Sequence, residues 1–206
     1  GLGDVYKRQA RSLMSYLNKF EIETSYGIKA WKRWGNTAEQ IIKSNPYVLC
    51  IQGVDLSFSR ADAVAAKSDI PADSECRIKA GITYILRQNA DQGHTCLPLD
   101  SLVKTAVSYL DVDEKLIKKV IEDETEEENL YYYDKHGRRF VMLADFYKAE
   151  DYIARRLAIM RQISYDNKID FSEVIDLEEE NNGIQYEKIQ REAINLALSK
   201  GFLVLT

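Results

Sequence analysis

Cysteine and histidine are scarce in this chain, and their scarcity excludes two classes of small protein. Cys50, Cys76 and Cys96 are odd in number and lie far apart, so they predict neither a disulfide framework nor a CxxC zinc knuckle. His94 and Cys96 could offer two metal ligands, but a metal site normally needs three or four, and no second pair follows at zinc-like spacing. We therefore expect no metal site and three reduced, packed thiols.

Long hydrophobic runs are also missing. No stretch approaches the roughly 18 consecutive apolar residues of a membrane-spanning helix, and the start lacks the charged-then-apolar order of a secretion signal. The 206 residues are 45% hydrophobic and 30% charged, which is enough for one or two compact domains. We expect a cytoplasmic protein that has no membrane partner.

Signatures of a free-standing enzyme are absent as well. The sequence has no paired carboxylates, nucleophile elbow or metal cluster at a convincing spacing. It also has no glycine-rich loop followed by the lysine and Ser/Thr that hold ATP phosphates and magnesium. A small independent enzyme is therefore the weakest interpretation.

Charge is plentiful but unevenly distributed. The net charge of −5 argues against a protein that coats nucleic acid by bulk charge. Residues 11–60 nevertheless hold seven Lys/Arg against four Asp/Glu, whereas residues 122–128 hold six acids in seven positions. Because such an acidic run repels phosphate, we expect any nucleic-acid surface to lie elsewhere.

The first nine residues, GLGDVYKRQ, resemble the translation of a sequencing-adapter end. We interpret residues 1–9 as adapter-derived and exclude them from the fold prediction. On that interpretation the natural protein also continues upstream.

Residues 10–75 predict short helices joined by glycine-containing turns. Helices are expected over 12–20, 28–35 and 37–43, and the last must end before Pro46. A turn at Gly53 then leads into a helix over 60–67, with Ser57 or Ser59 as its N-cap. This layout is typical of tandem helix-hairpin-helix units, which present turn amides and cations to a DNA backbone, although all-α domains of other kinds share it. The candidate DNA contacts here are Lys29, Lys32, Arg33, Gly53, Ser59 and Arg60.

Residues 76–162 begin with three expected helices. The first runs from Cys76 and is closed by Gly93. The second covers 97–110 and is capped at Asp100 or Ser101, and the third covers 111–124 and is capped at Asp111 or Asp113.

A β-hairpin is expected next, over LYYYDKHGRRFVML (130–143), with DKHG as its turn. Helix, helix, hairpin is the order of a winged helix, in which the hairpin tip often meets DNA. Lys135, Arg138 and Arg139 cluster at this tip and are candidate DNA contacts. The alternative is that these charges only keep the hairpin soluble, with the preceding acids partly cancelling their field.

The remaining sequence predicts a connection and the start of another domain. A helix is expected over 144–160, and the polar, acidic residues 163–183 are interpreted as a linker. In residues 184–206 a helix stopped by Gly201 is followed by FLVLT (202–206), an apolar run typical of a strand buried in a parallel sheet.

Three phrases resemble the N-terminal half of RecD-like DNA helicases, relatives of the exonuclease V alpha subunit. They are NPYVLC with FSRADAVA (45–65), GHTCLP (93–98, where the family usually has an aromatic in place of Cys96) and IQREAINLALSKGFLVLT (189–206). The resemblance spans about residues 12–206. It implies a mainly α chain of tandem helix-hairpin-helix units and a winged-helix-like module with one β-hairpin, then the first helix and strand of a RecA-like α/β ATPase domain, truncated just before the phosphate loop.

The same resemblance implies partners and cofactors. The parent helicase would act on DNA, single-stranded or forked, and would use ATP and Mg²⁺. Gln190 matches the glutamine that reads the adenine edge of ATP in this superfamily, and Gln185 is a weaker candidate. An amide suits that role because it can both accept from the adenine amino group and donate to a ring nitrogen.

A non-enzymatic alternative remains open at this point. The chain could be a winged-helix or helix-hairpin-helix adaptor that binds DNA or recruits proteins through its acidic stretches and exposed aromatics. Against it stands FLVLT, which would expose a hydrophobic strand edge if the adaptor ended there.

The missing phosphate loop gives a first testable prediction. We expect a polypeptide of these 206 residues to need no bound cofactor and to hydrolyse no ATP above background, because nothing in it can cradle the β- and γ-phosphates. A phosphate-release assay with and without single-stranded DNA measures this, and appreciable turnover in either condition would contradict it.

Overall fold

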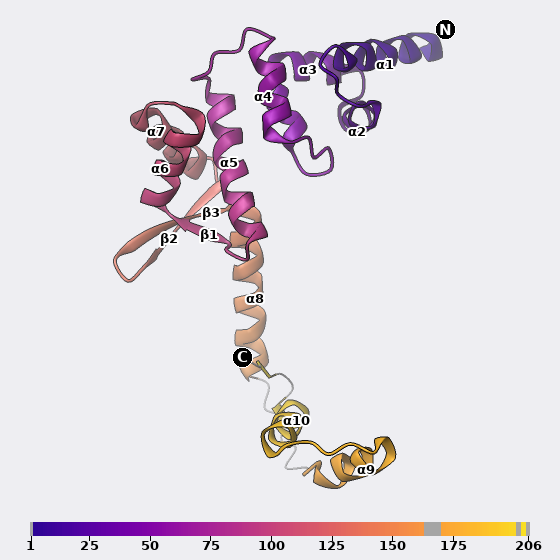
Figure 1. Ribbon diagram of the computed structural model, residues 1–206, viewed down its shortest axis with the longest axis vertical. Coiled ribbons are helices and arrows are strands. Elements are labelled where there is room, and N and C mark those ends of the chain that lie inside the picture. Colours follow the sequence, from indigo (N-terminus) through magenta and orange to yellow (C-terminus); the bar gives the residue numbers. More distant parts are fainter. Residues whose placement is uncertain (1, 163–169, 201–202, 205–206) are drawn as a thin grey trace. The chain divides into compact units, whose positions relative to one another are not determined.

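The computed structural model describes residues 2–162, 170–200 and 203–204. The chain is mainly helical and divides into two compact units, Gly1–Tyr147 and Lys148–Thr206 (Figure 1). Over the described ranges, no helix is both long and apolar enough to cross a membrane.

The first unit opens with the short helices that the sequence predicts. They are α1 (Leu2–Asn18), α2 (Thr24–Trp34), α3 (Ala38–Ser44) and α4 (Phe58–Ala66), with 3-10 turns η1 (Gly35–Thr37) and η2 (Pro46–Cys50). Gly35 ends α2 with a φ of 58°, a left-handed conformation that glycine adopts without strain. Asn45 is extended before Pro46, and its side chain accepts the Tyr47 N–H at 3.0 Å. The helices and their breaks are thereby confirmed, except that α1 begins at Leu2, within the nine residues that the fold prediction excluded.

The second half of this unit has the order of a winged helix. It consists of α5 (Glu75–Asp91), β1 (Cys96–Pro98), α6 (Leu99–Leu110), α7 (Glu114–Glu126), β2 (Leu130–Lys135) and β3 (Arg138–Leu143). The strands form an antiparallel sheet in the order β1-β3-β2, in which Val141 lies between Leu97 and Tyr132. The winged-helix-like module is confirmed, and β1 is a strand that the sequence does not predict.

Strand β1 also corrects one helix cap. The predicted caps of α6 at Asp100 or Ser101 are wrong, because Pro98 pairs with Phe140 in the sheet and α6 begins directly after it at Leu99. For α7, one of the two predicted caps is confirmed: Asp113 Oδ1 accepts the Lys115 N–H at 2.8 Å.

The wing turns tightly between β2 and β3. Only His136 and Gly137 separate the strands, and both have positive φ angles, 51° and 72°. A two-residue turn with two positive φ angles matches the right-handed twist of the flanking strands. The predicted hairpin and its turn are confirmed.

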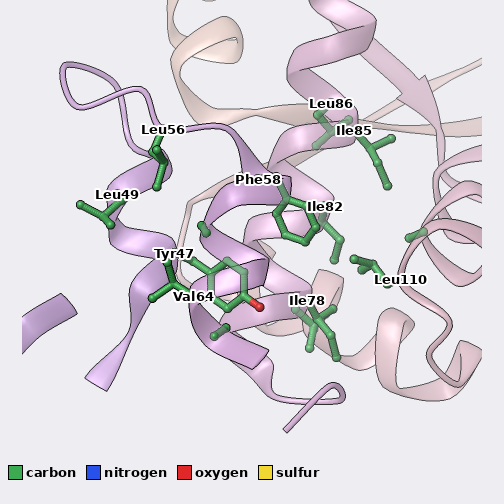
Figure 2. Close-up of a cluster of buried hydrophobic side chains, with 14 of the residues drawn as sticks. Tyr47, Leu49, Leu56, Phe58, Val64, Ile78, Ile82, Ile85, Leu86 and Leu110 are labelled. Atoms are coloured by element: carbon green, nitrogen blue, oxygen red, sulfur yellow. The ribbon is translucent and has the colours of Figure 1, made fainter. Parts of the chain in front are cut away.

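One hydrophobic core runs through the whole first unit. Figure 2 shows side chains from η2, α4, α5 and α6 meeting around α5, with Phe58 and Ile82 near the centre. Phe58 stacks between Tyr47 and Tyr84, with ring centroids 5.6 and 5.7 Å away. Helices α5 and α6 approach so closely that a Cβ at Gly81 would meet Leu110 at 2.6 Å. The expected division at residues 75 and 76 therefore falls inside one packed body.

Arg77 on α5 joins the two halves of this unit by hydrogen bonds. Its guanidinium donates to both carboxylate oxygens of Asp62 on α4, at 2.7 and 3.2 Å, and to the Leu110 carbonyl at 2.8 Å. The Tyr47 hydroxyl donates to the same carboxylate. Burial alone would raise the pKa of Asp62, but the hydrogen bonds from Arg77 and Tyr47 outweigh it and hold that pKa below its usual value.

Helix α8 (Ala144–Gln162) begins in the first unit and continues into the second, which also contains α9 (Ser172–Asn182) and α10 (Lys188–Lys200). Of the predicted linker 163–183, residues 163–169 lie outside the described residues, and the loop prediction is wrong for α9. Arg191 of α10 binds Glu179 at 2.6 Å and also pairs with Asp176, which fastens the acidic face of α9 to α10. Ile175 is buried in the same helix.

The predicted strand FLVLT (202–206) is not present in the two of its residues that the structure describes. Leu203 and Val204 are in neither helix nor strand, and Phe202, Leu205 and Thr206 lie outside the described residues. A strand needs a neighbour that completes its hydrogen bonds. The sheet that the described residues form contains only β1, β2 and β3.

The contact between Asp62 and Arg77 yields a stability prediction. We expect Asp62→Ala to lower the free energy of unfolding by about 2 to 3 kcal/mol. The substitution removes the carboxylate that accepts hydrogen bonds from the largely buried Arg77 guanidinium and from the Tyr47 hydroxyl. Asp73→Ala, at an exposed aspartate before α5, is the matched control and should change little. Urea denaturation measures both, and equal effects of the two variants would contradict the role given to Arg77.

The same contact predicts a pH dependence. Because the folded-state pKa of Asp62 is depressed, its stabilisation is present above the unfolded pKa of about 4 and is lost as the pH falls through the folded value. The difference in unfolding free energy between the natural chain and Asp62→Ala should therefore shrink below about pH 4. A constant difference from pH 7 to pH 3 would argue against this linkage.

Candidate nucleic-acid interface

The hairpin between η2 and α4 is the first element of the candidate interface. The Leu56 N–H donates to the Leu49 carbonyl at 2.9 Å, and Val54 and Leu56 are buried. With Val54 and Leu56 buried, Gln52 and Gly53 at the turn are exposed to solvent. Gly53 adopts a φ of 95°, which explains why glycine occupies the turn.

Asp55 modifies this hairpin in a way that the sequence analysis missed. Its backbone is left-handed, with a φ of 65°, and its Oδ1 accepts the Gly53 N–H at 3.0 Å. The turn amide that could receive a phosphate is therefore bonded to the protein's own carboxylate. An Asp two residues after a turn glycine is the available sequence signal, because Asp readily bonds nearby backbone amides.

The basic face of α2 lies beside the hairpin. Lys29, Lys32 and Arg33 follow the i, i+3, i+4 spacing that places side chains on one helix face. The Lys29 ammonium donates to the Val54 carbonyl at 3.1 Å and lies 3.6 Å from Asp55, which connects this face to the turn. Lys32 and Arg33 are exposed, and among the residues that the structure describes neither forms an ion pair.

Arg60 and Ser59 stand at the start of α4. Arg60 donates to the Glu21 carbonyl at 2.7 Å, pairs with Glu23 at 2.8 Å and lies over the Tyr26 ring. Its hydrogen bond is the main cause of a lowered pKa for Glu23. The guanidinium therefore holds α4 against the turn between α1 and α2. Ser59 is exposed, with its hydroxyl 3.4 Å from that of Ser57.

A groove beside the hairpin is a poor phosphate site. It has a volume of about 990 Å³ and lies between the hairpin and α5. Both of its cations are paired: Lys79 binds Glu124 at 2.8 Å, and Arg87 binds Asp145 at 2.8 Å. Burial raises the pKa of the Cys50 thiol in its wall to about 12, so that thiol stays protonated. No group of three or more His, Cys, Asp or Glu that could hold a metal ion occurs in the part of the chain described.

The three cations of the wing differ in their surroundings. The Arg139 guanidinium forms a bidentate ion pair with the Asp134 carboxylate, at 2.9 and 3.1 Å, and lies over the Tyr132 ring. Lys135 and Arg138 are exposed and have no ion pair among the described residues. Figure 1 shows the wing at the opposite side of the first unit from α2. The two groups of candidate contacts therefore form separate surfaces.

Gln190 lies in the second unit, near the start of α10. Its Oε1 accepts the Glu187 N–H at 2.9 Å, so the side chain closes the first turn of its own helix. Within the described part of the chain, no hydrogen bond of its amide nitrogen is seen. Its assignment as an adenine contact stays a prediction.

The comparison with protein families covers the part of the chain that contains α2 and the Gly53 hairpin. Residues 6–96 match the family model described as the ATP-dependent RecD2 DNA helicase HHH domain, where HHH stands for helix-hairpin-helix. The match runs from α1 to β1 and contains α2, the Gly53 hairpin and α4. It includes the phrases NPYVLC and FSRADAVA on which the resemblance rests, whereas residues 189–206 lie beyond it. Over residues 6–96 this chain is therefore similar to the HHH domain of RecD2-type ATP-dependent DNA helicases.

Proposed function

We propose that this chain supplies DNA-binding accessory modules to an ATP-dependent DNA helicase and grips the DNA backbone through the basic face of α2, beside the Gly53 hairpin. The observation that carries the proposal is the basic face of Lys29, Lys32 and Arg33, held against the hairpin by the bond from Lys29 to Val54. This arrangement lies within the residues that match the RecD2 HHH domain. DNA is the ligand that this class of domain generally binds.

The chemistry of this face favours phosphates over bases. Lys32 and Arg33 are exposed cations on a convex helix, without the buried amides or carboxylates that would read base edges. Binding of this kind is sequence-independent and weakens as salt rises, because each neutralised phosphate releases counterions. The acidic run at residues 122–128 belongs to α7 and the turn after it, a different part of the unit.

A charge-removal variant tests this surface. We expect the double variant Lys32→Ala, Arg33→Ala to bind a labelled single strand more weakly, and the slope of log Kd against log salt to fall by about 1.4 for two lost phosphate contacts. Fluorescence anisotropy titrations between about 50 and 200 mM salt measure both quantities. The matched control is Lys67→Ala, Lys104→Ala, which removes two exposed cations from α4's far end and from α6.

The control shows whether the loss of binding depends on the position of the removed charges or only on their number. If both double variants weaken binding equally, the α2 face has no special role. If the natural chain fails to bind single-stranded or forked DNA even at low salt, the proposed function is wrong and a protein-recruiting adaptor is favoured.

Asp55 provides a prediction in the opposite direction. Its carboxylate lies against the Gly53 amide and should repel a phosphate that approaches the hairpin. We expect Asp55→Asn to tighten DNA binding about two- to fivefold at low salt, because it removes the charge while an Asn tolerates the positive φ and can still accept the Gly53 N–H. The control is Asp69→Asn, the same change at an exposed aspartate with a φ of 56°. Equal Kd values for the two variants in the anisotropy assay would exclude the hairpin as a phosphate contact.

A further inference from the structure

The outer face of the wing carries a row of aromatic side chains. Residues that pair directly across β2 and β3 share a face, and the register pairs Tyr131 with Met142, Tyr133 with Phe140 and Lys135 with Arg138. The alternate face holds Val141, which is fully buried. Tyr131, Tyr133 and Phe140 therefore lie on the opposite face, which is buried at its base, at Met142, and exposed toward the tip, at Tyr133.

These aromatics are ordered by mutual contacts. Tyr131 stacks on Tyr147 at the start of α8, with ring centroids 4.1 Å apart and an interplanar angle of 3°. The ring centroids of Tyr133 and Phe140 lie 6.4 Å apart, and Tyr133 is 46% exposed. Because alternate residues of a strand lie about 7 Å apart, Tyr131, Tyr133 and Lys135 form a row with two rings and one cation on one face.

The two faces of the wing carry different charged residues: Asp134 and Arg139 share one face, and Lys135 and Arg138 share the other. Asp134 is the only acid in residues 130–143, and it lies on the core-side face, where Arg139 neutralises it. Lys135 and Arg138 share the outer face with the aromatic row. Among the described residues neither forms an ion pair, so the tip of this face presents two positive charges, whereas Glu128 accepts from the Tyr131 hydroxyl, at 3.5 Å, at the other end of the row.

A single strand of nucleic acid fits this combination better than a duplex or a protein does. Exposed tyrosine rings offer flat surfaces on which unpaired bases can stack, and that stacking does not depend on sequence. The bases of a duplex are already stacked on each other and cannot use these rings. The two cations at the tip match a strand's phosphates, whereas an apolar protein partner would leave them unpaired.

We propose that the outer face of the wing is a second binding surface, specific for single-stranded DNA, on which bases stack on Tyr133 and its neighbouring rings while Lys135 and Arg138 hold the phosphates. The inference deepens the proposed function and rests on it in taking DNA as the ligand. It uses residues outside the α2 face, so the two surfaces can fail independently.

An abasic strand separates stacking from charge. The full 206-residue chain is titrated with three labelled probes of equal length: oligothymidine, the same backbone without bases, and a blunt duplex. We expect Tyr133→Ala to weaken oligothymidine binding by about fivefold or more and to leave binding of the abasic strand and the duplex unchanged. Tyr133→Phe, which keeps the ring, should bind all three probes like the natural chain.

Further variants complete the test. Lys135→Ala with Arg138→Ala should weaken binding of oligothymidine and the abasic strand alike, and Tyr152→Ala, at an exposed tyrosine of α8, should have no effect. The inference is overturned if Tyr133→Ala leaves oligothymidine binding unchanged, or if it weakens all three probes equally. In either case the proposed function survives as long as the α2 variant still reduces binding.

Discussion

The guanidinium of Arg77 joins the two halves of the first unit. Its bonds reach Asp62 in the helix-hairpin-helix half, the Ala72 carbonyl in the connection, and the Leu110 carbonyl at the end of α6. Only arginine offers enough donors in a planar fork to satisfy a carboxylate and two carbonyls together. Around this contact, α5 can serve both as the last helix of the family-matched region and as the first helix of the winged module. The hairpin and the wing are consequently parts of one body, and a strand that engages both must follow its surface.

Many of the chain's cations are used for structure. Arg60, Arg77, Arg139 and Lys79 each bind acids or carbonyls, and the hydrogen bond that Lys79 donates to Glu124 is the main cause of a raised pKa for Lys79. An ion pair at a protein surface adds little stability, but it removes a positive charge from the field that a phosphate meets. Among the described residues, α2 and the wing tip each carry neighbouring exposed cations without an ion pair, Lys32 with Arg33 and Lys135 with Arg138. A chain with a net charge of −5 can therefore still carry local basic surfaces.

Most helices and the hairpin were predictable, because their signals are local. Apolar spacing, Pro46 and Gly35 mark the early helices, and the DKHG turn marks the wing. Strand β1 was missed because CLP has no periodicity of its own and becomes a strand only by pairing with β3, about 45 residues later in sequence. Helix α9 was taken for a linker because its acidic residues are typical of a solvated loop. They are held in a helix by Arg191, which no local pattern relates to them.

The same distinction holds for the candidate sites. Sequence by itself determined which residue types were available: the i, i+3, i+4 cations of α2, the glycine of the hairpin, and the tyrosines and cations of the wing. Tertiary structure decided which of these groups are already bonded within the protein. Arg60 binds Glu23 and the Glu21 carbonyl, 37 and 39 residues away in sequence, and the Asp55 carboxylate accepts the Gly53 N–H. It also sorted the wing, because strand register places Asp134 with Arg139 on one face and the aromatic row with Lys135 and Arg138 on the other. Composition and spacing specify what a segment can do, whereas the availability of a charge depends on neighbours that only the folded chain brings together.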